Sequence, residues 1–188
     1  MLDLSVGLDE LQYVSEIHII AVNNEVKELL WLINKNHSET PLIKTINITK
    51  NSNEKFEFYW NKKHIAEYTT PKKYLYEPNA AIMKSGAFDL VSEKYKLYKL
   101  HQHTHLYTSD KLIDFPGRRF DIKEVIPFQK KEIKKSLLIK KANITTRNFP
   151  ETVSKIRKKL KISDGGDDYL FFTTSGNEQK IILVCSKV

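Results

Sequence analysis

The side chains best suited to chemistry in this sequence are basic, and they cluster in the last third of the chain. Between Lys130 and Lys161 the sequence has ten lysines and two arginines against two glutamates, a local charge of +10, whereas the whole chain carries +8. The rest of the chain therefore sums to about −2. Positive charge confined to one segment is typical of a surface that binds a polyanion, because every phosphate it neutralises releases counterions.

Several predicted elements carry the candidate binding residues. We expect helices over 130–138 and 150–160, with a strand over 141–146 between them. Arg147 and Asn148 lie where this strand meets the second helix, so backbone N–H groups could hold an anion there and Arg147 could add a bidentate donor. The candidates are Lys130, Lys131, Lys134, Lys135, Lys141, Arg147, Asn148, Lys155, Arg157, Lys158, Lys159 and, after a Pro-Gly turn, Arg118.

These residues also have a structural interpretation. A run of charges is usually a solvated helix face, Asn148 could cap the second helix, and Arg147 could pair with a nearby acid. The run nevertheless continues across two neighbouring helices and the strand between them. This continuity favours binding to nucleic acid, and it predicts an affinity that falls steeply with salt.

Other reactive side chains give weaker patterns. His101, His103 and His105 alternate, so on a strand they would share one face, where three imidazoles could ligate zinc. No carboxylate or cysteine of suitable spacing completes such a site, and exposed strand histidines without a metal are the better interpretation. Cys185, the single cysteine, lies in an apolar terminal strand and is expected to be a buried hydrophobe. With no nucleophile elbow and no phosphate-binding glycine loop, we predict no catalytic residue.

The elements before the basic segment predict a mixed α and β fold. Residues 15–22 form an apolar run typical of a buried strand, and 25–34 has the apolar spacing of a helix that Asn23-Asn24 would cap. Such a βα unit resembles the end of an α/β sheet whose earlier strands are absent. We therefore expect the chain to be the C-terminal part of a longer protein.

The remaining elements are short. In the last third we expect an α-β-α-β-β order, in which Asp164, Gly165 and Gly166 form a helix stop and turn. The other predicted strands are 42–49, 55–60, 74–76, 97–100, 105–107, 118–125, 169–174 and 180–185, and the other predicted helices begin at Asn79 and span 87–95.

The composition indicates whether the chain folds and in which compartment it is expected. Hydrophobic residues make up 40% and charged residues 29% of the 188 residues, which is typical of a folded chain. No apolar run has the length of a membrane span, and no signal peptide is recognisable. With one cysteine, no intrachain disulfide can form. We expect a cytoplasmic protein without a membrane partner.

Several motifs together resemble a bacterial family of class I SAM-dependent methyltransferase-like proteins, and they cover nearly the whole chain. Two groups resemble the family's ferredoxin-like insert and its C-terminal THUMP-like domain, and a third is similar to the segment that closes its Rossmann-like catalytic domain. The insert motifs are residues 74–88, 105–109 and 115–118; the THUMP-like motifs are 146–150, 157–160 and 164–166; the closing-segment motifs are 2–4 and 25–30.

The resemblance implies a C-terminal portion with an α+β fold. It would consist of the terminal βα unit of a Rossmann-like domain (1–70), a small ferredoxin-like domain (71–126) and a THUMP-like α/β domain (127–188). The family's SAM-binding loop and catalytic residues lie upstream, so SAM is implied for the parent protein and no cofactor for this chain. THUMP domains are associated with RNA binding and usually present tRNA to a modifying domain. The implied partners are RNA, in particular tRNA, and the missing catalytic domain.

A different class of function stays open. The N-terminal βα unit would expose apolar surface that normally packs on the missing catalytic domain. The chain would then be a protein-interaction or structural module without a nucleic-acid ligand. This alternative predicts a homodimer formed through the exposed unit.

Overall fold

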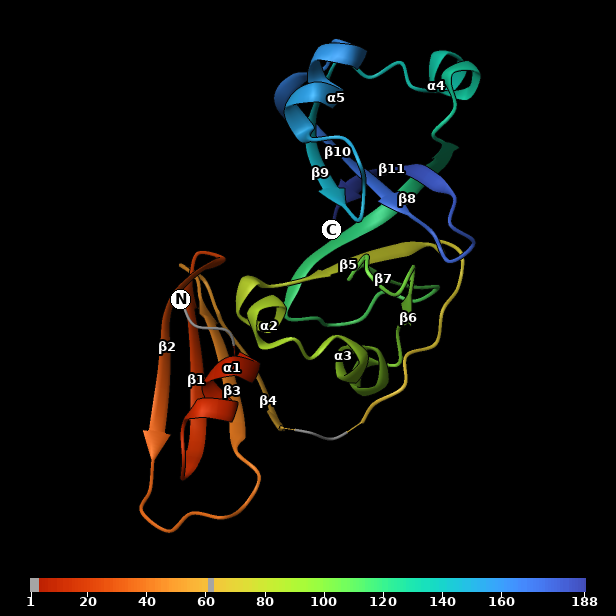
Figure 1. Ribbon diagram of the computed structural model, residues 1–188. Coiled ribbons are helices and arrows are strands. Elements are labelled where there is room, and N and C mark those ends of the chain that lie inside the picture. Colours follow the sequence, from red (N-terminus) through yellow and green to blue (C-terminus); the bar gives the residue numbers. More distant parts are fainter. Residues whose placement is uncertain (1–3, 61–62) are drawn as a thin grey trace. The chain divides into compact units, whose positions relative to one another are not determined.

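The structure, a computed structural model, describes residues 4–60 and 63–188 (Figure 1). The chain forms two compact units, the first from Met1–Ile65 with Pro78–Leu90 and the second from Ala66–Glu77 with Val91–Val188. The mixed α+β class predicted from the sequence is confirmed. Residues 2 and 3, which belong to the closing-segment motif, lie outside the described residues.

The first unit is built on a four-stranded sheet with the order β2-β1-β3-β4. β1 pairs antiparallel with β2 and parallel with β3, and β3 pairs antiparallel with β4. Its core contains Ile17, Ile19 and Ile43 from the sheet, Leu4 from α1 and Ala81 from α2. The elements are α1 (Leu4–Glu10), β1 (Val14–Val22), β2 (Glu25–Ile33), β3 (Leu42–Ile48), β4 (Asn53–Tyr59) and α2 (Ala80–Ser85).

The helix predicted over 25–34 is wrong, because these residues form β2. Asn23 and Asn24 have φ angles of 49° and 64°, so they make the two-residue turn of a β-hairpin instead of capping a helix. Leu29 and Trp31 then lie opposite core residues of β1. A register shift next to the turn interrupts the alternation, which explains why the apolar spacing imitates a helix. The predicted βα unit is therefore a β-hairpin.

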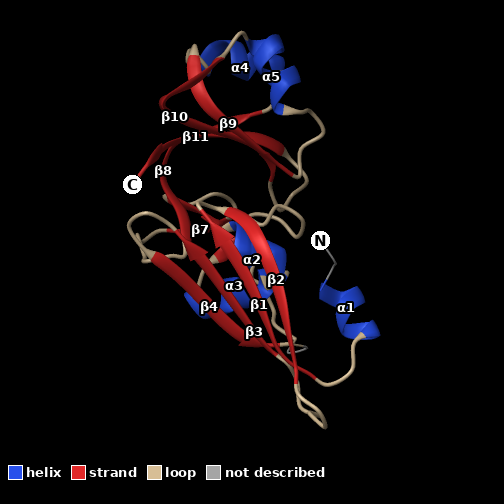
Figure 2. Cartoon of the chain, turned by 90° about the vertical axis from the view of Figure 1, so that its left-hand side faces the viewer, coloured by secondary structure: helices blue, strands red, loops and turns tan. Residues whose placement is uncertain are grey.

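The second unit contains a seven-stranded sheet with the order β6-β7-β5-β8-β11-β10-β9. β9 pairs parallel with β10, whereas β10 with β11 and β11 with β8 are antiparallel. Figure 2 shows the strong curvature of these strands. The strands are β5 (Tyr74–Pro78), β6 (Tyr98–Lys99), β7 (Tyr107–Ser109), β8 (Gly117–Pro127), β9 (Lys141–Arg147), β10 (Ser163–Thr174) and β11 (Lys180–Lys187), and the helices are α3 (Phe88–Tyr95), α4 (Lys130–Ser136) and α5 (Val153–Leu160).

Two apolar cores occupy the two faces of this curved sheet. The alternation along β10 shows the division, because Leu170 and Phe172 enter one core and Phe171 enters the other. The first of these, the helix-side core, also receives Ile133 of α4 and Ile156 of α5. We call the other the inner core; it includes Leu75, Leu100, Phe120, Leu183 and Cys185. α4 and α5 thus cover one face of the sheet, and the inner core lies on the other face.

The predicted α-β-α-β-β order of the C-terminal part is confirmed, with two local differences. α5 begins at Val153, after the cap Thr152 whose hydroxyl accepts from the Lys155 N–H, and not at Pro150. The predicted turn at 164–166 lies inside β10 instead. Gly165 and Gly166 have φ of 91° and 86°, which permits a bulge where the pairing with β9 skips several residues.

Candidate nucleic-acid interface

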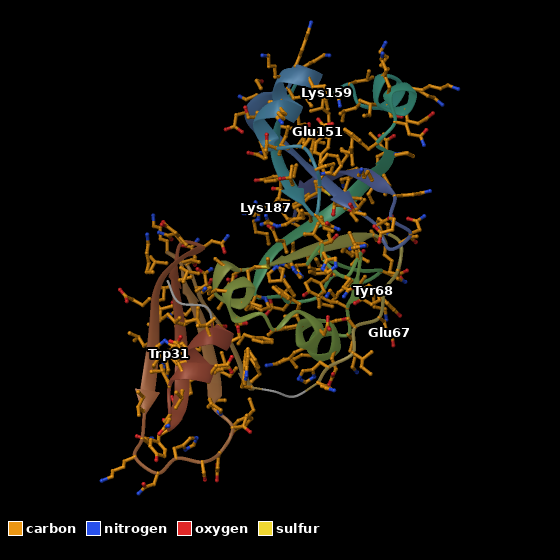
Figure 3. The ribbon with its side chains drawn as sticks, in the orientation of Figure 1. Trp31, Glu67, Tyr68, Glu151, Lys159 and Lys187 are labelled. Atoms are coloured by element: carbon orange, nitrogen blue, oxygen red, sulfur yellow. The ribbon has the colours of Figure 1, made fainter. Side chains whose placement is uncertain are left out.

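The lysines of α4 and α5 form an exposed basic surface on the helix-covered side of the sheet. Ile156 is fully buried beneath α5, so the polar residues of that helix face outward. Lys159 forms an ion pair of 2.8 Å with Glu151, and both residues are labelled in Figure 3. Within the described residues, the others have no ion pair. This helix-lysine surface consists of Lys130, Lys131, Lys134, Lys135, Lys155, Lys158 and Lys159, all exposed.

Arg157 lies on the same helix but makes structural contacts. Both of its Nη atoms donate to the carbonyl oxygen of Ala142 at 3.1 Å, and Nη2 also pairs with Asp164. These contacts connect α5 to β9 and β10. Arg157 therefore holds the helix in place, while the neighbouring lysines remain in solvent.

Arg118 and Arg147 lie on the opposite face of the sheet. The pairing of β9 with β10 sets Thr145 opposite Phe171 and Arg147 opposite Thr173, so these side chains point to the inner-core face. Arg118 is also on this face, since its guanidinium lies 5.5 Å from the ring centre of Phe120. The twelve residues predicted from the sequence are thus divided between the two faces of the sheet. Lys141 is exposed at the start of β9, the edge strand.

Glu77 connects the two arginines. Its side chain is only 4% exposed. Arg118 Nε donates to Oε2 at 2.7 Å, with Nη2 donating to the same oxygen, and Arg147 Nη2 lies 2.7 Å from Oε1. The distance to Oε1 suits an ion pair, although its angles do not meet hydrogen-bond geometry. The structural interpretation of Arg147, pairing with an acid, is therefore confirmed.

Sequence reasoning missed Glu77, although a signal existed. It is an acidic residue within the apolar strand Tyr74–Pro78, where a carboxylate needs a charged partner if it is buried. The partner could not be identified from spacing, because β5 and β9 are separated by three strands in the sheet. Only the curvature of the sheet brings Glu77 and Arg147 together.

Asn148 does not cap α5. It has a φ of 49° and its Nδ2 lies 3.1 Å from Nδ1 of His101, which also accepts from the backbone N–H of His103. Since Nδ1 accepts, the proton of the neutral ring is on Nε2, which donates to Glu178 at 2.7 Å. His101 is thus fixed between two side chains from elsewhere in the fold.

The interpretation of these three residues as exposed strand histidines is wrong. His101, His103 and His105 lie in the connection between β6 and β7, and His105 has a φ of 52° that breaks an extended backbone. In the part of the chain that the structure describes, no group of three or more His, Cys, Asp or Glu side chains could hold a metal ion. Cys185 is buried as predicted, and burial raises the pKa of its thiol far above the ordinary value.

The domain composition follows from these folds and from comparison with known families. Residues 74–116 match the model of a ferredoxin-like domain, and residues 117–187 match the model of a THUMP-like domain. The chain therefore carries a ferredoxin-like domain followed by a THUMP-like domain. The helix-lysine surface lies in the latter. The three-part division at residues 70 and 126 stays a prediction.

A solved structure is similar over the whole chain. The crystal structure of a "putative methyltransferase" from Porphyromonas gingivalis W83 is 36% identical in sequence, with a TM-score of 0.93. The match covers 100% of this chain and 49% of that chain, so this chain spans about half the length of the P. gingivalis protein. No curated protein matches the chain. Among the described helices, none is long and apolar enough to cross a membrane.

Proposed function

We propose that this chain is the RNA-binding portion of a SAM-dependent RNA methyltransferase and presents RNA to a catalytic domain outside it. The main observation that supports this proposal is the helix-lysine surface, whose exposed cations all belong to the THUMP-like domain. Similarity to one half of the P. gingivalis protein supports the link to methyl transfer. SAM then binds outside this chain, and a reducing cytoplasm suits the free thiol of Cys185.

Electrostatics favours a polyanion as the ligand of this surface. α4 and α5 carry lysines whose ammonium groups have no carboxylate partner among the described residues, apart from Lys159. Unpaired, solvated lysines act as point charges that can each neutralise one phosphate without losing an existing ion pair. Binding by them is expected to follow the RNA backbone rather than the base sequence.

Replacing four helix lysines should weaken tRNA binding. We expect Lys134→Ala, Lys135→Ala, Lys155→Ala and Lys158→Ala together to lower the affinity for tRNA by at least about tenfold at low salt. The slope of log affinity against log salt should fall in magnitude by about 0.7–0.9 for each lost phosphate contact. Filter binding over a salt series measures both quantities.

The matched control removes the same kind of charge elsewhere. Lys27, Lys35, Lys50 and Lys55 are exposed in the first unit, and replacing all four by alanine should leave both affinity and slope near those of the unchanged chain. An equal loss in the two sets of variants would contradict a localised interface. Calorimetry with SAM on the same sample tests the second part of the proposal, because SAM binding by this chain alone would place the cofactor site inside it.

Protein interaction is a second candidate function, supported by the outer face of the four-stranded sheet. This face, opposite the core of the first unit, exposes Leu30 and Leu32 of β2, Ile48 of β3 and Tyr59 of β4. The ion-paired Glu16, His18 and Lys44 separate these side chains, so Leu30 and Leu32 on the edge strand β2 are the apolar part of this face that a protein could contact. Light scattering over a concentration series is expected to show self-association that Leu30→Glu abolishes. A strictly monomeric, stable chain would count against this function.

A further inference from the structure

The buried carboxylate of Glu77 holds two guanidinium groups at one place on the inner-core face. The Arg118 side chain is 35% exposed and the Arg147 side chain 38%, so water reaches both although their common partner is buried. In the described part of the chain neither arginine has a second carboxylate within ion-pair distance. Two cations and one anion leave this cluster with a net charge of +1.

The arginines also keep unused donors. A guanidinium has five N–H groups in a fixed plane. Arg118 uses Nε and Nη2 for Glu77, with Nη2 also 3.5 Å from the hydroxyl of Thr145, and its Nη1 has no partner among the described residues. Arg147 uses Nη2 for Glu77 and Nη1 for the carbonyl of Thr146, while its buried Nε has no acceptor in the part of the chain that the structure describes. The Arg118 Nη1 group therefore offers a free donor to an oxygen ligand, whereas the Arg147 Nε is buried out of reach of one.

Charge and geometry together select the ligand. We propose that Arg118 and Arg147, oriented by Glu77, bind a phosphodiester group of RNA; this rests on the proposed RNA-binding function. A phosphodiester carries one negative charge and matches the net +1 of the cluster, whereas a phosphate monoester carries about −1.5 to −2. Planar guanidinium donors bind paired phosphate oxygens better than ammonium groups do. The Thr145 hydroxyl gives a further polar contact at the edge of the site.

This site is separate from the helix-lysine surface. The lysines lie on the helix-side face of the sheet, and Arg118 and Arg147 lie on the inner-core face. One RNA strand contacting both would have to pass around the edge strand β9. The two sites can therefore be removed independently by mutation, which makes their contributions measurable one at a time.

A structural role alone would give different results. Glu77 joins β5 to β9 across three intervening strands, so the cluster also stabilises the curved sheet. If it does only this, Glu77→Gln destabilises the fold and leaves anion binding unchanged. If the arginines bind a phosphodiester in the orientation that Glu77 gives them, Glu77→Gln also weakens binding of the diester by about fivefold or more, because the amide has one acceptor oxygen and leaves one guanidinium unanchored.

The test is a titration of the whole chain with a 5′-hydroxyl tetrauridylate, which contains only phosphodiester groups. The NMR signals of the Arg118 and Arg147 Nε–H groups report binding at the site. They should shift both in the unchanged chain and in the variant lacking the four helix lysines. Arg147→Lys keeps the charge but loses the planar donors, and it should weaken binding at least about fivefold. Arg119→Lys, on the neighbouring residue paired with Asp114, is the matched control and should bind like the unchanged chain.

The possible outcomes separate this inference from the proposed function. If Glu77→Gln does not fold, the affinity of Arg147→Lys for the tetrauridylate still tests the site. Unshifted arginine signals, or unchanged affinity in a folded Arg147→Lys chain, overturn the phosphodiester site. Equal or tighter binding of uridine monophosphate or inorganic phosphate overturns the assignment to the RNA backbone. If instead the helix-lysine variant binds tRNA normally while the arginine signals shift, the proposed interface on α4 and α5 fails and the arginine site stands.

Discussion

Replacing Phe172 by alanine is expected to lower the free energy of unfolding of the second unit by about 3–5 kcal/mol. Phe172 is fully buried in β10, at the centre of the helix-side core. Its ring lies 5.6 Å from that of Phe149 and 6.0 Å from that of Phe128, both edge-on. Truncation removes these contacts and leaves a cavity that the surrounding strands cannot close fully.

Urea unfolding followed by far-UV circular dichroism measures this loss. The two tryptophans of the chain, Trp31 and Trp60, both belong to the first unit and pack against its core, so their fluorescence reports that unit instead. Since the cores are separate clusters, we expect the fluorescence transition to keep its midpoint in Phe172→Ala. Phe172→Leu, which retains most of the apolar volume, should lose much less. A loss below about 1 kcal/mol for the alanine variant would show that this core is not close-packed.

Strands with uninterrupted alternation could be predicted from the sequence. In β3, the side chains of Ile43, Thr45 and Asn47 are buried as the period of two requires, and the turn that follows forms near residues 49–52. Side chains also alternate between the two faces of β2, but a register shift beside the turn interrupts the two-residue period of buried positions. Here the decisive residues are Asn23 and Asn24, whose left-handed conformation suits a hairpin as well as their side chains suit a helix cap.

The sequence pattern also does not predict which residues of the candidate site come together, because this depends on the topology of the sheet. The basic character of α4 and α5 follows from the sequence, since residues on one helix share a face by their spacing alone. Which face of the sheet receives Arg118 or Arg147 depends on strand order and on the β10 bulge, which a local pattern does not encode. The link from Glu77 to Arg147 joins residues 70 positions apart in the sequence, and it exists only because the sheet curves.

The histidines show that one backbone angle can make a sequence pattern misleading. Alternation of His101, His103 and His105 suggests a shared strand face, but the positive φ of His105 ends any extended conformation there. His101 is instead buried and held by Asn148 and Glu178, which come from distant parts of the second unit. Such contacts between distant residues decide the role of a polar side chain, and they become visible only in the folded chain.

Replacing Ile17 by alanine is expected to destabilise the first unit by about 2–5 kcal/mol. Ile17 is fully buried in β1, the strand that pairs with both β2 and β3, and it lies opposite Trp31 and Ile43. The truncation therefore opens a cavity beside the indole of Trp31. Tryptophan fluorescence during urea unfolding should show the lower midpoint directly.

The neighbouring outward position supplies the control for this prediction. Ile20→Ala removes the same atoms from the opposite, partly exposed face of β1, so we expect a loss well below that of Ile17→Ala. Equal losses at the two positions would mean that both faces of the sheet are packed equally well. The outer face would then be a second core rather than a surface available to another protein, and the interaction function would lose its structural basis.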